Sequence, residues 1–159
     1  MYSGYAEAVA RWLSEEQQHI WRSYLGMVAR LEAAMNRQLQ RDYGLSLADY
    51  DVLVELSERG PMRINDLADA LCWEQSRLSH QLRRMRDRGL VVRRGVDEDR
   101  RGATMDITDR GDAALRAAAP GHVELVRSTV FEGMEPAQLR ALGSLTETVL
   151  ERLATSPPR

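Results

Sequence analysis

A run of arginine, serine and histidine side chains within residues 73–101 has the residue types and spacing to bind nucleic acid. The run holds nine arginines against five acidic residues, a local charge of +4, although the whole chain has a net charge of −2. Guanidinium groups pair with phosphate and with guanine, and hydroxyl and imidazole groups can hydrogen-bond to base edges. Because the distribution of charge matters more than its sum, the pattern favours one basic binding face rather than a general nucleic-acid coat.

Residues 73–88 are expected to form one helix that separates apolar from polar side chains. At about 100° per residue, Leu78, Leu82 and Met85 share a buried stripe. The N-terminal half of such a helix meets base edges, and later positions meet phosphate. A solvated basic helix without a binding role is the alternative. The side chains predicted to read bases are Ser76, Arg77, Ser79 and His80, and those predicted to contact phosphate are Arg83 and Arg84.

Two β-like segments, residues 91–96 and 103–108, follow this helix directly and are joined by the polar sequence DEDRRG. Arg100 and Arg101 fall at the tip of this predicted hairpin, where a guanidinium can enter a narrow minor groove and gain from its negative potential. Asp99 lies two residues before Arg101 and could hold that side chain in place. A charged β-turn with no role in DNA contact is the alternative.

The surrounding helices and strands must position these side chains, and residues that typically start or stop a helix predict where most of these elements lie. A short helix, a tight turn and a second helix followed by a two-stranded ribbon define a winged helix-turn-helix. In chain order we expect a helix from a Ser14–Gln17 capping box to Gly44, a helix from Ser46 to Gly60, a minimal strand at Met62 and Arg63, a short helix capped by Asn65, the helix 73–88 ended by Gly89, the hairpin, a helix capped by Thr108 that Pro120 and Gly121 bend and Gly133 ends, and a last helix from Pro136.

The two terminal helical regions have more apolar surface than a small winged core can cover. We therefore expect them to join two copies of the chain, and a dimer would double the DNA site about one helical turn away. Packing within one chain is the alternative. The apolar residues concerned are Trp12, Leu13 and Trp21 near the start, and Leu139, Leu142, Leu145, Val149 and Leu153 near the end.

The predicted fold class is therefore mainly α with a small β-hairpin wing. Residues 1–159 are interpreted as a single domain, with dimerisation helices at 14–43 and 109–154 and a winged helix-turn-helix region at 46–108. The hydrophobic share of 43% and charged share of 29% are typical of a globular protein. The absence of a signal-like or membrane-spanning stretch and the single cysteine predict a cytoplasmic protein without membrane contact.

With these pieces in place the chain resembles the MarR family of transcriptional regulators over nearly its whole length. Two departures are Ile107 in place of the usual Leu, and Trp73 with Glu74 where small or hydroxyl residues are common; Glu74 would repel phosphate. The segments that carry the resemblance are residues 45–53 (LSLADYDVL), 62–68 (MRINDLA), 76–82 (SRLSHQL), 88–91 (RGLV), 97–102 (DEDRRG) and 107–111 (ITDRG).

The resemblance implies an obligate homodimer joined by the terminal helices and bound to a pseudo-palindromic operator. Each recognition helix would enter a major groove and each wing an adjacent minor groove. It also implies a pocket between the dimerisation and DNA-binding regions for a phenolic or other aromatic acid that releases DNA. The candidate lining residues are Trp21, Tyr24, Tyr50 and His122; the alternative is that they are core or interface residues, as such aromatics more often are.

Other chemistry is weakly indicated. Cys72 precedes the recognition helix and is expected to be buried and inert; oxidant sensing is the alternative. Glu15 and His19 share a helix face, but two ligands do not make a metal site, and we expect no metal or cofactor. No catalytic or phosphate-cradling motif is present, so an enzyme is not expected. The competing hypotheses are a winged helix that binds protein, and a nonspecific chromosomal protein.

Overall fold

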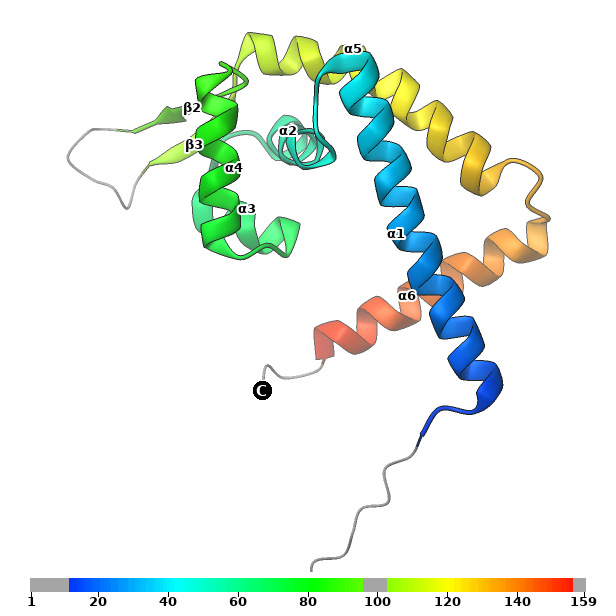
Figure 1. Ribbon diagram of the computed structural model, residues 1–159. Coiled ribbons are helices and arrows are strands. Elements are labelled where there is room, and N and C mark those ends of the chain that lie inside the picture. Colours follow the sequence, from blue (N-terminus) through cyan, green and yellow to red (C-terminus); the bar gives the residue numbers. More distant parts are fainter. Residues whose placement is uncertain (1–11, 96–102, 156–159) are drawn as a thin grey trace, which may run out of the picture.

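The computed structural model describes residues 12–95 and 103–155 of the chain, and these residues fold into helices and one small antiparallel sheet, which lies at one edge of the molecule (Figure 1). This arrangement confirms the predicted fold class. The elements are α1 (Glu15–Tyr43), α2 (Leu47–Arg59), β1 (Met62–Arg63), α3 (Ile64–Leu71), α4 (Gln75–Asp87), β2 (Val91–Arg94), β3 (Thr104–Ile107), α5 (Asp109–Val126), a π-helical segment η1 (Arg127–Phe131) and α6 (Pro136–Thr155).

The ends of α1 lie where the capping residues predict them. The Ser14 hydroxyl accepts from the Gln17 amide N–H at 3.1 Å, and the Gln17 side chain accepts from the Ser14 N–H at 2.9 Å. At the other end Gly44 adopts the left-handed conformation (φ 65°), which a residue with a Cβ adopts only at a cost. Ser46 then caps α2 two residues later, so the joint between α1 and α2 is short and well defined.

Two predicted helix starts were wrong. Asn65 does not cap α3, because α3 begins at Ile64 with Arg63 at the N-cap and no side-chain cap. The Asn65 side-chain oxygen instead accepts from Gln75 at 2.9 Å, across the turn between α3 and α4. The recognition helix α4 begins at Gln75 rather than at Trp73, with Glu74 as its N-cap residue.

The apolar core lies entirely between Leu39 and Ala118 and is built around α2, α3, α4 and the sheet. The strands are ordered β1-β3-β2, with Met105 of β3 opposite both Met62 and Arg93. Gly111 allows the start of α5 to pack on this sheet, since a Cβ there would lie 2.1 Å from the Leu90 carbonyl oxygen. The core thus fixes α4 and the base of the wing relative to each other.

The C-terminal part of the chain extends away from this core (Figure 1). Helix α5 continues through Pro120 to Val126, and the Glu132 N–H then donates to the Arg127 carbonyl at 2.8 Å, the wide turn of a π-helix. Gly133 (φ 78°) follows, and α6 starts at Pro136 as predicted. No residue of α6 is buried.

None of the described helices combines the length and the hydropathy that a membrane span requires.

Candidate nucleic-acid interface

Helix α4 separates its side chains as its sequence predicts. Leu78, Leu82 and Met85 are at most 3% exposed and anchor the helix in the core. Gln81 is buried with them, which the apolar pattern did not predict. All six side chains predicted to face DNA from this helix are exposed: Ser76, Arg77, Ser79, His80, Arg83 and Arg84.

Neighbouring side chains on this exposed face contact one another. Arg83 Nη2 lies 3.1 Å from His80 Nδ1, one helical turn away. The Arg77 guanidinium lies 4.2 Å from the centre of the Trp73 ring, a cation–π contact. Arg77 is therefore held at the N-terminal end of α4 beside the α3–α4 turn, while His80 and Arg83 occupy the middle of the exposed face.

The wing extends the same polar surface from the end of α4. Strands β2 and β3 pair Val91 with Ile107 at the base and Arg94 with Thr104 furthest out. Arg94 Nε contacts Asp106 Oδ2 at 2.5 Å across the two strands. The predicted tip residues Asp99, Arg100 and Arg101 lie outside the described residues, so their roles stay predictions.

Behind α4, a cluster of polar side chains joins this helix to the α1–α2 joint, and we call it the Asp49 cluster. It comprises the side chains of Asp49, Gln81, Arg84 and Arg88 with the Gly44 carbonyl. Asp49 accepts from Gln81 Nε2 at 2.6 Å and from Arg88 Nη1 at 2.7 Å. Arg88 Nη2 donates to the Gly44 carbonyl at 2.6 Å, and Arg84 donates to Gln81 Oε1. A hollow of about 480 Å³ opens over these groups.

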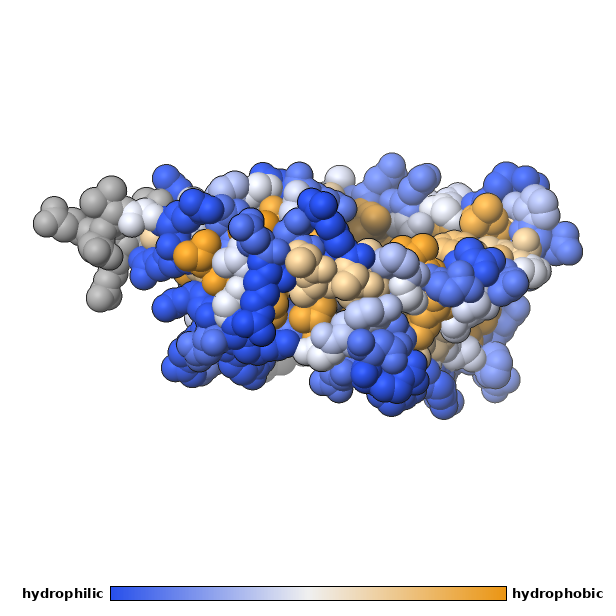
Figure 2. All heavy atoms as spheres, turned by 90° about the horizontal axis from the view of Figure 1, so that it is seen from above, coloured by the Kyte–Doolittle hydropathy of each residue, from blue (hydrophilic) through white to orange (hydrophobic). Residues whose placement is uncertain are grey.

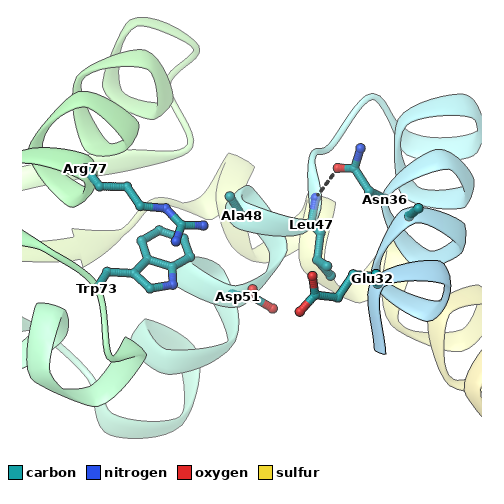
Figure 3. A pocket seen from close by; sticks show the side chains of 9 residues that line it. Glu32, Asn36, Leu47, Ala48, Asp51, Trp73 and Arg77 are labelled. Carbon is teal, nitrogen blue, oxygen red and sulfur yellow. Dashed lines mark hydrogen bonds between the residues drawn. The ribbon is translucent and has the colours of Figure 1, made fainter. Parts of the chain in front are cut away.

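A second hollow, of about 570 Å³, lies between α1, α2 and the α3–α4 turn (Figure 3). Glu32 of α1 and Asp51 of α2 point toward each other across it, and Trp73 with Arg77 forms the opposite wall. Partial burial, followed by the nearby Glu32 carboxylate, raises the pKa of Asp51, while Arg77 opposes this shift. The cavity thus combines an aromatic face with groups of both charges.

The four aromatic residues predicted to line an effector pocket form two pairs. Trp21 and Tyr24 stack on α1 with ring centres 5.6 Å apart, and Tyr50 and His122 meet at 4.4 Å. The second pair belongs to the Gly44 end of α1, since Tyr43 packs beside Gly121. The helix rise of about 1.5 Å per residue puts Trp21 roughly 30 Å from Tyr43. Within one chain the pairs therefore do not share a pocket, and neither lines the two hollows described above.

His122 is nonetheless chemically distinct. Its Nδ1 is buried with no hydrogen-bond partner among the described residues, and burial lowers the pKa of its imidazole. The imidazole ring packs against Tyr50, which is itself buried. This geometry fits core packing at the junction of α2 and α5.

The prediction that Cys72 is buried was wrong, because its side chain is exposed. Cys72 ends α3 in the left-handed conformation (φ 52°), and this sharp turn directs the chain into α4. Residue spacing alone did not reveal the turn, since glycine or asparagine usually occupies such a position. In the described part of the chain, no three His, Cys, Asp or Glu side chains gather as metal ligands would.

A helix-turn-helix with an exposed basic second helix, followed by a β-ribbon wing, defines a winged-helix DNA-binding protein. Comparison with known proteins agrees: the MarR family model matches residues 45–102. The chain is 31% identical to the HTH-type transcriptional regulator PecS of Dickeya dadantii over 126 residues, which is 74% of this chain and 76% of PecS. This chain belongs to the MarR family of transcriptional regulators, which bind DNA.

Solved structures from Streptomyces coelicolor extend the similarity to the terminal helices. The MarR family regulator Sco3205, crystallised in complex with DNA, is 40% identical with a TM-score of 0.85, covering 94% of each chain. The MarR family regulator AbsC is 36% identical with a TM-score of 0.83, covering 92% of this chain and 100% of AbsC.

Proposed function

We propose that this chain is a homodimeric repressor that binds a pseudo-palindromic DNA operator and leaves it when a small molecule binds. The observation that carries the proposal is the exposed face of α4. Six polar side chains lie in solvent on this face, the apolar side chains of the same helix are buried in the core, and the wing with its arginines follows directly. Sco3205, with a similar fold over almost its full length, was crystallised with DNA. We place this activity in the cytoplasm.

The proposed division of labour follows helix-turn-helix geometry. Ser76, Arg77, Ser79 and His80 would reach base edges from the N-terminal half of α4, where a side chain can contact the major groove. Arg83 and Arg84 would contact phosphate. Arg100 and Arg101 would enter the minor groove, with Asp99 holding Arg101.

The dimer is supported by the apolar residues that the two terminal helices leave in solvent. Ile20, Trp21 and Met27 of α1 are each more than half exposed, as are Leu145 and Leu153 of α6. Figure 2 shows hydrophobic side chains between polar ones from the middle of the molecule to the end opposite the wing. Burial of such surface in a second copy would be strongly favourable. We therefore assign residues 14–43 and 109–154 to dimerisation and 46–108 to DNA binding.

The effector site is best supported at the hollow between α1, α2 and the α3–α4 turn. Its walls come from a proposed dimerisation helix and from the DNA-binding region, so an occupant would contact both. Trp73 offers a face for an aromatic or phenolic ring, and Arg77, Asn36 and Asp51 offer polar partners. Arg77 also belongs to α4, so a ligand that moved it would change the surface offered to DNA. The ligand acts only if its affinity differs between the two arrangements.

Selection of bound sequences from a random duplex pool, followed by fluorescence anisotropy on the selected duplex, tests the proposal. A dimer-sized complex on a two-fold symmetric sequence is expected. Substituting Ser76 or His80 with Ala should change the preferred sequence, whereas Arg83→Ala should weaken all duplexes alike and lower the salt dependence. Equal affinity for every duplex would support a nonspecific protein instead. No binding at moderate salt would support a protein-binding winged helix.

A further inference from the structure

The Asp49 cluster places one buried carboxylate between the α1–α2 joint and the exposed side of α4. We propose that Asp49 is a positioning residue for DNA binding: through Gln81 it holds the Arg84 guanidinium on the exposed side of α4, and through Arg88 it fixes the end of α4 against the end of α1. The inference rests on the proposed contact between α4 and DNA.

The hydrogen bonds of Asp49 leave Gln81 only one orientation. Ionised carboxylates only accept hydrogen bonds, so Gln81 must present its NH₂ group to Asp49, at 2.6 Å. Its carbonyl oxygen then faces the other way, toward a guanidinium, which can only donate. The contact of Arg84 with Gln81 Oε1 follows from this order. The charge of Asp49 therefore determines where Arg84 is held, although the two residues are on different helices.

Burial makes this order strict. Asp49 and Gln81 are each 3% exposed, so water cannot readily replace a lost partner for either. Asp49 is also the third residue of α2 and accepts from the Ser46 N–H at 2.8 Å, which keeps its side chain in place. The start of α2 thus holds the carboxylate independently of its contacts with α4.

Arg84 itself is exposed. Its guanidinium is held on the protein side by Gln81 and remains accessible to a phosphate on the solvent side. An arginine already held in one geometry loses less side-chain freedom when it binds. Arg88 has a different task. By binding Asp49 and the Gly44 carbonyl together, it ties the last turn of α4 to the end of α1, the helix that we assign to dimerisation. The placement of each recognition helix within a dimer would depend on this tie.

The test uses the full-length protein and a duplex that the wild-type protein selects from a random pool. Gln81→Met keeps volume and helix propensity but removes both hydrogen bonds. Asp49→Asn introduces a donor at position 49, so the Gln81 amide can reverse and turn its NH₂ group toward the Arg84 guanidinium, which has no acceptor. Asp42→Asn is the matched control, since Asp42 is an exposed carboxylate of α1 that pairs with Arg41. Affinity is measured over a range of salt concentrations, and Tm is recorded for each variant.

We expect Gln81→Met and Asp49→Asn to weaken binding about 2- to 10-fold, the effect of one hydrogen bond. The slope of log affinity against log salt should fall by about 1, as for Arg84→Ala. Gln81→Met combined with Arg84→Ala should bind no worse than Arg84→Ala alone, and Asp42→Asn should bind like the wild type. A merely structural role would lower Tm and leave the salt slope unchanged.

Two results would overturn the inference while leaving the proposed function intact. One is a Gln81→Met variant with wild-type affinity and salt slope. The other is a double variant whose loss of affinity equals the product of the losses caused by Gln81→Met and Arg84→Ala separately, because the two residues would then act independently. Failure of the wild-type protein to select any duplex would instead overturn the proposed function, and the inference with it.

Discussion

The winged core and the terminal helices of this chain are built from similar proportions of apolar residues but use them differently. Between Leu39 and Ala118 the large apolar side chains interdigitate, and Leu53, Leu67 and Leu78 are completely buried. In α6 no residue is buried, and in α1 only Gln38 and Leu39, at the end next to the core, are buried. One region therefore completes its packing within the chain, and the other does not.

This difference separates two sources of stability. The core should hold its structure at any protein concentration, because all its contacts are within one chain. The terminal helices should gain most of theirs from a second copy, so their contribution should depend on concentration. The same substitution type therefore has different consequences in the two regions.

The largest effect is expected in the core. Leu53→Ala removes a completely buried side chain and should reduce the free energy of unfolding by about 2–5 kcal/mol. Urea denaturation followed by circular dichroism measures the loss, which should appear as an added destabilisation of similar size at low and at high protein concentration. A loss below about 1 kcal/mol would show that this core is not closely packed.

The next effect should fall on assembly rather than on folding. Leu145→Asp places a charge on the exposed face of α6, and two-fold symmetry would place it at the interface twice. Because Leu145 is 59% exposed in one chain, each of the two leucines should contribute about 1–2 kcal/mol to the interface, and their loss should yield monomers at micromolar concentration in light scattering after size-exclusion chromatography.

Val92→Asp is the matched control, because Val92 is an exposed apolar residue of the wing. It should leave the oligomeric state unchanged. If Leu145→Asp stayed dimeric as well, the apolar face of α6 would not be the interface, and the comparison between the two regions would lose its explanation.

Helix-capping and turn residues in the sequence predict most of the fold. Helix ends are set by local contacts: the backbone groups there are satisfied by residues only a few positions away. The spacing of these residues in the sequence is therefore sufficient to predict where the helices begin and end, as at Ser14, Gly44, Ser46 and Thr108. Predictions failed where residue type and spacing did not show the contact or the backbone conformation that decides the outcome. Asn65 resembles a cap but bonds to Gln75, and Cys72 occupies a left-handed turn that its residue type does not suggest.

The candidate site shows the same division. Helical periodicity was enough to identify the exposed face of α4, because that face depends only on its own helix. The Asp49 cluster depends on which helices meet: Asp49 and Arg88 are 39 positions apart. A hydrophilic residue on an apolar face, such as Gln81 between Leu78 and Leu82, was the available signal for a buried polar contact.

The joint between the two regions allows a smaller and more specific test. Gly44→Ala should cost about 1–2 kcal/mol from backbone strain alone, since an added Cβ at Gly44 would contact nothing within 4 Å. Gly143→Ala is the matched control within α6, where the added Cβ also meets open space; there alanine should stabilise by about 0.5–1 kcal/mol. Thermal unfolding measures both. The same sign for both would exclude the left-handed turn as the cause.

The smallest effect concerns Asp51, at the cavity between the two regions. Because burial and Glu32 raise its pKa in the folded protein, ionised Asp51 opposes folding at neutral pH. Asp51→Asn should therefore raise Tm at pH 7. This gain should shrink as pH falls through the folded pKa and should vanish below the unfolded value of 3.8, where both side chains are neutral. Asp42→Asn should act in the opposite direction at pH 7, since the Arg41 hydrogen bond lowers the pKa of Asp42. A lower Tm for Asp51→Asn at pH 7 would mean that Arg77 outweighs Glu32 and burial, and that the cavity stabilises a negative charge.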